Sequence, residues 1–260
     1  MCRKVNTAPG FLTVPPRARK PRRVGLTHVL DKGLPVGEAA GLLDVCGDFV
    51  DVWKFGWGTA YLDPGLAAKL VVLREHGVLG CTGGTLLEVA WHQGAVQPFL
   101  DWAGDLGFPC VEVSSGVAPI GPADKRELIE TAAARFVVLA EIGSKDPAAE
   151  VTPSSWAAAA AADRAAGATW VVTEGRESGT VGLFSADGAV RTDVAAAVVD
   201  AVGVERAVFE APRKEQQAWL IRRFGPDVSL GNIPPAEILG VEALRLGLRA
   251  DTFTALPVPR

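Results

Sequence analysis

The sequence predicts an α/β fold, a (β/α)8 barrel of the TIM type, and three observations support it. Short β-rich runs recur eight times along the chain, separated by segments with helical patterning. Most of the runs pass directly into charged residues or glycine, as strands do where they enter the loops of a barrel. The length of 260 residues suits a single barrel of this kind.

The eight predicted strands are spaced along nearly the whole chain. They lie in RVGLTHVLD (23–31), DFVDVWKFG (48–56), GVLGCTGG (77–84), FPCVEVSSG (108–116), RFVVLAEIG (135–143), ATWVVTEG (168–175), RAVFEAP (206–212) and DVSLGNI (227–233). A doubly wound open sheet is the alternative fold. That fold usually has a glycine-rich phosphate turn after its first strand, and VLDKGLP is not such a turn.

Three of the intervening segments carry signals for the start or the face of a helix. In LDPGLAAKLVVLREHG, Asp63 and Pro64 predict the start and Gly77 the end. In SSWAAAAAADRAAGA, Ser154 or Ser155 is the expected N-cap of an alanine-rich helix. In AEILGVEALRLGLR, one apolar face is formed by Ile238, Val241, Leu244 and Leu248.

The composition is that of an ordinary globular protein. With a net charge of −4 and a pI near 5.5, the chain as a whole does not favour nucleic acid or an anionic membrane. No run approaches the roughly 18 apolar residues of a membrane span, and the start has no apolar signal core. Four scattered cysteines without a C-x-x-C motif indicate reduced thiols and no zinc site. We therefore expect a cytoplasmic protein.

The N-terminal segment differs from the rest of the chain. TAPGFLTVPPRARKPRR is rich in proline and basic residues. We interpret residues 1–21 as a flexible, solvated arm and residues 22–260 as one barrel domain. An arm that binds nucleic acid is the alternative, but nothing else in the chain supports it.

The residues at the carboxyl ends of the predicted strands are mostly polar or charged. In a (β/α)8 barrel the active site lies at the carboxyl ends of the strands, so these residues meet at one mouth. They are Asp31, Lys32, Lys54, Thr82, Gly83, Gly84, Glu112, Glu141, Lys145, Glu174, Arg176, Glu210, Arg213, Lys214 and Asn232.

Glutamate closes three consecutive predicted strands, at Glu141, Glu174 and Glu210. One glutamate at a strand end is commonly solvated or paired with a cation. Three that project together repel one another unless something neutralises them. A hard divalent cation with oxygen ligands does so, and the sequence therefore predicts a Mg²⁺ site. The three histidines are far apart in the sequence and form no competing cluster.

Basic residues from different strands point to an anionic ligand. Lys54, Arg176, Arg213 and Lys214 are expected to converge at the mouth, where arginine binds carboxylate or phosphate through paired N–H groups. Glycines in GGT and GRESGT let backbone N–H groups approach an oxyanion. The combination favours a small molecule that carries both phosphate and carboxylate.

Seven segments have long and unusual sequences and run in order from about Arg22 to Phe253. They are VGLTHVLDKG, VDVWKFGWGTA, GGTLLEVAWHQG, EGRESGT, FEAPRKEQQ, LGNI and LRADTF. Together they resemble the phosphosulfolactate synthase family. The resemblance implies a Mg²⁺-dependent barrel that adds sulfite to phosphoenolpyruvate. The product is (2R)-phospho-3-sulfolactate, on a route to coenzyme M or sulfolactate, and the enzyme is a homo-oligomer.

With this resemblance we assign expected roles. Lys54 and Lys145 are the expected catalytic residues, with Lys145 giving a proton to the substrate carbon. Its alternative interpretation is a plain surface lysine. The expected metal ligands are Glu141, Glu174 and Glu210. The expected substrate-binding residues are Lys32, Gly83, Gly84, Arg176, Arg213, Lys214 and Asn232.

Two positions depart from the family pattern. Ser144 stands where the family commonly has a second lysine, and Ser115 stands where it often has an acidic or amide residue. They leave open a related metal-assisted addition or isomerisation on another phospho-carboxylate. A non-catalytic barrel, like the plant members associated with heat tolerance, is the second alternative. The complete set of charged residues at the mouth favours the enzyme.

Overall fold

The computed structural model describes residues 10–146 and 150–253, and in them eight parallel strands form a closed barrel in chain order. The strands are β1 Thr27–Asp31, β2 Val52–Phe55, β3 Leu79–Thr82, β4 Cys110–Val113, β5 Val137–Ile142, β6 Trp170–Thr173, β7 Ala207–Glu210 and β8 Ser229–Ile233. Each strand lies inside the run in which it was expected. The predicted (β/α)8 fold is therefore confirmed.

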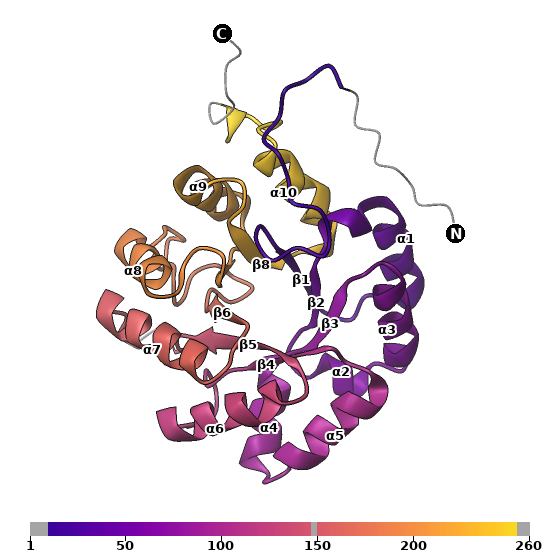
Figure 1. The fold of residues 1–260 in the computed structure, drawn as a ribbon, viewed down its shortest axis with the longest axis vertical. Helices are drawn as coiled ribbons and strands as arrows, with labels where there is room; N and C mark the ends of the chain where they lie inside the picture. The colour runs from indigo at the N-terminus through magenta and orange to yellow at the C-terminus, as the bar shows by residue number, and fades with distance from the viewer. Residues whose placement is uncertain (1–9, 147–149, 254–260) are drawn as a thin grey trace.

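Helices surround the barrel on its outside, as Figure 1 shows. They are α1 Val36–Cys46, α2 Thr59–Leu62, α3 Leu66–Glu75, α4 Gly84–His92, α5 Val96–Leu106, α6 Pro122–Ala133, α7 Pro153–Ala165, α8 Thr192–Val202, α9 Lys214–Phe224 and α10 Ile238–Arg245, with 3₁₀ turns η1 Gly47–Phe49 and η2 Pro235–Glu237. In the described part of the chain, no helix combines the length and apolar character needed to cross a membrane.

Three details of the expected helices are wrong. The helix α3 begins at Leu66 because Asp63 accepts a hydrogen bond from the Gly65 N–H (2.8 Å) and holds a turn before the helix. The N-cap of α7 is Thr152, since its hydroxyl accepts from the Ser155 N–H (3.2 Å). The helix α10 ends at Arg245, so Leu248 lies beyond the helix and is exposed.

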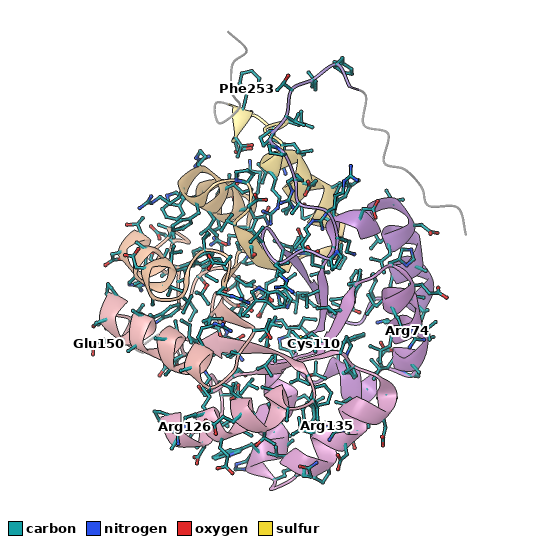
Figure 2. The ribbon with its side chains drawn as sticks, viewed as in Figure 1. Arg74, Cys110, Arg126, Arg135, Glu150 and Phe253 are labelled. Atoms are coloured by element: carbon teal, nitrogen blue, oxygen red, sulfur yellow. The ribbon has the colours of Figure 1, made fainter. Side chains whose placement is uncertain are left out.

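Apolar residues pack on both sides of the sheet. Two large clusters join the outer faces of the strands to the helices, and a smaller cluster contains one or more residues from each of β2 to β7. Cys110 belongs to this smaller cluster and lies near the centre of Figure 2, whereas the labelled arginines lie toward the periphery. The inside of the barrel is therefore a packed layer and not a pore.

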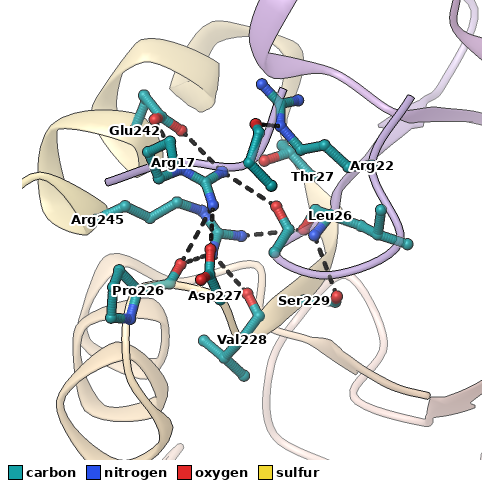
Figure 3. A network of polar contacts seen from close by, with 12 residues as sticks. Arg17, Arg22, Leu26, Thr27, Pro226, Asp227, Val228, Ser229, Glu242 and Arg245 are labelled. Atoms are coloured by element: carbon teal, nitrogen blue, oxygen red, sulfur yellow. Dashed lines mark hydrogen bonds and ion pairs between the residues drawn. The ribbon is translucent and has the colours of Figure 1, made fainter. Parts of the chain in front are cut away.

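A network of arginines closes the barrel at the amino ends of β1 and β8 (Figure 3). Arg245 is fully buried and donates hydrogen bonds to the carbonyl oxygens of Leu26 and Val228. Arg17 donates to Glu242 (2.9 Å) and Asp227 (3.0 Å). The network joins the segment before the first strand to the last strand and to α10.

Two basic residues of the expected arm take part in such contacts. Arg17 belongs to the network, and the Lys20 ammonium group donates to the carbonyl oxygens of Gly47 (2.9 Å) and His76 (3.0 Å). Burial lowers the pKa of Lys20 to about 8. These two side chains are bound to the barrel and only partly exposed. The boundary at residue 21 stays a prediction.

Replacing Arg17 tests the contribution of this network to stability. In Arg17→Ala, Glu242 loses a partner at a site where its side chain is only 5% exposed, so we expect the free energy of unfolding to fall by about 2–4 kcal/mol. Urea denaturation measures the change. Arg126→Ala removes an exposed ion pair to Glu130 and should cost less than about 0.5 kcal/mol. Equal losses in the two variants would contradict the prediction.

Candidate active site

The charged residues inside the barrel follow the inner apolar layer by a fixed spacing. In five strands an inward apolar residue is followed two positions later by a buried charged residue. The pairs are Val52 and Lys54, Cys110 and Glu112, Leu139 and Glu141, Val172 and Glu174, and Val208 and Glu210. Because side chains alternate between the faces of a strand, each charge lies directly above the apolar layer. The packed layer is the floor of the site.

A cavity of about 190 Å³ lies above this floor at the carboxyl ends of the strands. Three cationic and five anionic side chains line it, so its charge with every group ionised is three minus five, or −2. They are Lys54, Lys145, Arg176, Glu112, Glu141, Glu174, Glu177, Glu210. Seven of these eight residues belong to the set expected at the strand ends, and Glu177 does not.

Lys54 lies at the centre of the acidic group. Its ammonium group donates to Glu112 (3.0 Å) and to Glu210 (2.9 Å), and its side chain is only 6% exposed. Burial by itself would lower the pKa of Lys54, but the surrounding carboxylates outweigh it and raise the pKa well above its ordinary value. Lys54 is therefore a fixed positive charge that holds β2, β4 and β7 together at the site.

The loop after β6 folds onto the same carboxylates. Glu210 accepts from the N–H groups of Gly175 (2.9 Å) and Arg176 (3.1 Å), and Glu174 accepts from the Arg176 N–H (2.7 Å). Arg176 has φ 53°, in the left-handed region that residues other than glycine rarely adopt. The two carboxylates hold this strained turn, and the turn brings the Arg176 side chain to the cavity.

Lys145 lies beside Glu141 at the wall of the cavity. Its ammonium group is 3.5 Å from Glu141 Oε1 and 3.8 Å from Glu88 Oε1, with 19% of the side chain exposed. Burial would lower the pKa of Lys145, but the attraction of Glu141, Glu174 and Glu88 is greater and raises it. Lys145 is therefore a half-buried, protonated residue of the site and not a plain surface lysine.

The three expected metal ligands differ in the hydrogen bonds that their carboxylates accept. Glu210 is engaged by Lys54 and by two backbone N–H groups, whereas Glu141 Oε1 and Glu174 Oε2 are buried and accept no hydrogen bond. Burial and repulsion by Glu141 and Glu210 raise the pKa of Glu174 well above its ordinary value. In the described residues, no three His, Cys, Asp or Glu side chains are arranged to hold a metal ion. The expected three-glutamate cluster is therefore not seen, but two acidic oxygens fit a cation.

Glu112 is a charged residue of the cavity that the expected ligand set leaves out. It accepts from Lys54 and from the Gly84 N–H (2.9 Å), and it lies in the cavity lining. Its position was marked by its place near the carboxyl end of a predicted strand and by its two-residue spacing from Cys110. The run of three consecutive glutamates drew attention to β5, β6 and β7 instead.

The pKa of Glu112 predicts how stability depends on pH. Burial raises this pKa to about 7, with repulsion from Glu141 and Glu210 opposing the attraction of Lys54. A carboxyl group with a raised pKa stabilises the fold at low pH, and this contribution is lost as the pH rises from the unfolded pKa through about 7. When the pH rises from about 5 to about 8, the free energy of unfolding of the wild type should therefore fall by about 1–3 kcal/mol more than that of Glu112→Gln. Urea denaturation at both pH values tests this. An equal fall in the wild type and in Glu112→Gln would contradict the prediction.

Not all expected substrate-binding residues reach the cavity. Lys214 pairs with Asp251 (3.2 Å), Arg213 is exposed beside the backbone of Gly188, and neither lines the cavity. Lys32 lines a neighbouring cavity of about 390 Å³. Their sequence positions at strand ends could not show where long side chains would point.

The glycines and Asn232 lie at the site itself. The Gly84 N–H is taken by Glu112, so it is not free for an oxyanion, and a Cβ at Gly83 would lie 2.6 Å from the Phe55 carbonyl oxygen. Asn232 has φ 53°, its side-chain oxygen is buried without a hydrogen-bond partner, and it lines both cavities. Asn232 therefore presents an unpaired side-chain oxygen between the two cavities, while the glycines allow close packing.

A closed (β/α)8 barrel with a polar cavity at the carboxyl ends of its strands defines a TIM-barrel enzyme. The family model of (2R)-phospho-3-sulfolactate synthase matches residues 15–251. The chain belongs to this family.

Several relatives match over most of their length. The phosphosulfolactate synthase of Methanothermobacter thermautotrophicus is 42% identical over 94% of this chain and 96% of its own. That of Bacillus subtilis is 37% identical over 93% and 97%. The Arabidopsis thaliana protein heat-stress-associated 32 is 26% identical over 88% of both chains. Among solved structures, 3-hexulose-6-phosphate synthase from Salmonella typhimurium aligns with a TM-score of 0.58 and 16% identity, over 86% of this chain and 100% of its own. This last likeness shows the fold alone.

Proposed function

We propose that this protein adds sulfite to phosphoenolpyruvate to form (2R)-phospho-3-sulfolactate, with Mg²⁺ as its cofactor. The observation that carries the proposal is the pairing of Lys145 with Glu141 (3.5 Å) near Glu174, whose Oε2 is a buried carboxylate oxygen without a hydrogen-bond partner. A lysine that can deliver a proton then lies next to a place for a cation. The family membership supports the choice of substrates.

The charge of the cavity supports a cation cofactor. With every group ionised, its five acids outnumber its three bases, and burial raises the pKa of Glu112 and Glu174. A bound cation would favour the charged forms of these acids and offset their repulsion of a phosphorylated carboxylate. Glu141 and Glu174 are the residues that would hold Mg²⁺, which commonly takes one or two carboxylates and fills its other positions with water and substrate oxygens. When bound, the ion would neutralise the substrate carboxylate and stabilise negative charge that develops there.

The residues of the chain have distinct tasks in this reaction. Arg176 and Asn232 line the cavity and are the groups that would orient the anionic substrate. The sulfur of sulfite forms a bond to the methylene carbon, and the electron pair of the carbon–carbon double bond moves toward the carboxylate. Sulfite needs no activating base, so positioning is the main service of the enzyme in this step. Lys145 then transfers a proton to the adjacent carbon from one face, which sets the R configuration.

The two departures from the family pattern lie away from the cavity. The Ser144 hydroxyl accepts from the Asp146 N–H (3.1 Å), and Ser115 lines a separate cavity between α6 and α7. Neither residue lines the cavity that holds Lys145. Both departures are therefore compatible with the family substrate. A homo-oligomeric state, a cytoplasmic location and a place before coenzyme M or sulfolactate remain expectations.

Replacing Glu174 tests the cofactor proposal. Glu174→Gln removes an acidic group whose Oε2 is buried and accepts no hydrogen bond, so we expect Mg²⁺ affinity to fall about 10-fold or more. Calorimetric titration of Mg²⁺ into the protein measures this without turnover. Glu177→Gln, at an exposed acid of the same cavity, is the matched control and should change affinity less than about 3-fold. Unchanged affinity in Glu174→Gln would exclude Glu174 as a ligand.

The reaction itself can be tested directly. The purified protein is incubated with phosphoenolpyruvate, sulfite and Mg²⁺, and the mixture is followed by mass spectrometry. We expect a species with the mass of phosphosulfolactate that is absent when EDTA is added. Binding of phosphoenolpyruvate without conversion would point to another nucleophile or substrate. If nothing binds, the non-catalytic alternative replaces the proposal.

A further inference from the structure

Glu88 is a buried carboxylate outside the set of strand-end residues. It lies on α4 and is 1% exposed. Its Oε1 accepts from the Ser114 hydroxyl and the Gly116 N–H (3.1 Å), and its Oε2 accepts from the N–H groups of Val117 (2.7 Å) and Ala118 (2.6 Å). Four donors from one short loop after β4 therefore converge on a single side chain.

The same loop supports Lys145. A Cβ built on Gly116 would lie 3.1–3.3 Å from Cγ, Cδ and Cε of Lys145, so the stem of the lysine lies against the backbone of Gly116. The ammonium group at the end of this stem is 3.8 Å from Glu88 Oε1. Glu88 thus attracts the ammonium group of Lys145 directly, and it holds Gly116, against which the aliphatic part of Lys145 packs.

Glu88 does not itself reach the substrate. The residues that line the cavity include Val117 of the loop but not Glu88. A carboxylate that is buried behind the wall, with all its contacts directed to the protein, cannot serve as a substrate ligand there. Its effect on the reaction must pass through the groups that it holds.

We propose that Glu88 is a positioning residue that fixes Lys145 and the Ser114–Ala118 loop in the arrangement needed for proton transfer. The inference rests on the proposed role of Lys145 as the proton donor. Proton transfer requires the donor within hydrogen-bond reach of the carbon that accepts the proton, and small displacements from a reactive geometry slow a reaction strongly. Three N–H groups and one hydroxyl of the loop bind this one carboxylate, which joins the loop to α4.

The main test is Glu88→Gln in the full-length protein. The amide keeps the size of the side chain but directs an NH₂ group at N–H donors, so the loop loses part of its support. We expect kcat for phosphosulfolactate formation to fall about 10- to 100-fold while KM for phosphoenolpyruvate changes less than about 3-fold. The reason for this division is that Arg176 and Asn232, which would bind the substrate, are held by other residues: the Arg176 N–H by Glu174 and Glu210, and the Asn232 N–H by His28.

The matched control is Glu242→Gln. It makes the same chemical change at another buried, paired glutamate, at the opposite end of the barrel (Figure 3). We expect its kcat and KM to equal those of the wild type. If Glu88→Gln behaves like this control, the inference is wrong.

A double variant tests whether the effect passes through Lys145. When Lys145 is already replaced by Met, adding Glu88→Gln should lower kcat by less than about 2-fold, because the group that Glu88 positions is gone. A full additional loss would show that Glu88 acts by another route and would overturn the inference.

Two further measurements keep the inference testable if Glu88→Gln folds poorly or if the wild type fails to convert these substrates. Gly116→Ala leaves Glu88 intact and presses a methyl group against the Lys145 stem, so kcat should fall while KM holds. An unchanged kcat would refute positioning by this loop. Hydrogen exchange of the Gly116, Val117 and Ala118 amides needs no activity, and these amides should be protected in the wild type. Rapid exchange there would refute the contact itself, whereas an inactive wild type with protected amides would refute only the proposed reaction.

Discussion

Replacing Lys54 by Met should lower the free energy of unfolding by about 3–5 kcal/mol and abolish activity. Lys54 is the cation between Glu112 and Glu210, and both carboxylates are nearly inaccessible to water. Without it, two buried acids face each other with Glu141 close by, and burial makes their charged forms costly. Urea denaturation gives the stability, and the mass-spectrometric assay gives the activity.

A triple variant separates the two effects. When Lys54→Met is combined with Glu112→Gln and Glu210→Gln, the uncompensated charges disappear, so most of the stability should return. Activity should stay absent, because the site has lost its central charges. If Lys54→Met alone were as stable as the wild type, the ion pairs of Lys54 would not have the role that their geometry gives them.

Replacing Lys145 by Met should depress kcat by about 10²-fold or more and leave binding of phosphoenolpyruvate nearly intact. Lys145 lies at the wall of the cavity, and its pKa is raised by neighbouring carboxylates, so it carries a proton at neutral pH. Steady-state kinetics and calorimetric titration with phosphoenolpyruvate measure the two quantities separately.

Lys145→Arg is the informative companion. Arginine keeps the positive charge but does not give up its proton, so this variant should be nearly as slow as Lys145→Met. Recovery of turnover by arginine would mean that the residue acts as a fixed charge. Wild-type turnover in Lys145→Met would mean that the proton comes from elsewhere.

The barrel could be predicted because its signals are local. Each strand is a short apolar run that ends in charge or glycine, and this pattern repeats with the period of a β/α unit. Helix starts were predicted less well. Asp63 accepts from the Gly65 N–H in a turn that precedes α3, and the cap of α7 is Thr152, whose hydroxyl accepts from the Ser155 N–H.

The site could be predicted in part for a related reason. Position along a strand determines which residues reach the mouth, so Lys54, Glu141, Glu174 and Glu210 were found. The direction in which a long side chain points is set by tertiary contacts, so the ion pair of Lys214 with Asp251 could not be predicted. Glu88 was missed because it reaches the site from a helix and from behind the wall.

The packed layer beneath the charged residues also has a thermodynamic consequence. Apolar residues of β2 to β7 fill the barrel directly below the acids, so these acids cannot be hydrated from that side. Burial of these neighbouring acids therefore lowers the free energy of unfolding when no bound ion offsets their repulsion. A cation or substrate that offsets this repulsion binds the folded chain and not the unfolded chain, so it raises the melting temperature. The melting temperature therefore reports whether the site is occupied, and it can be measured before any turnover is known.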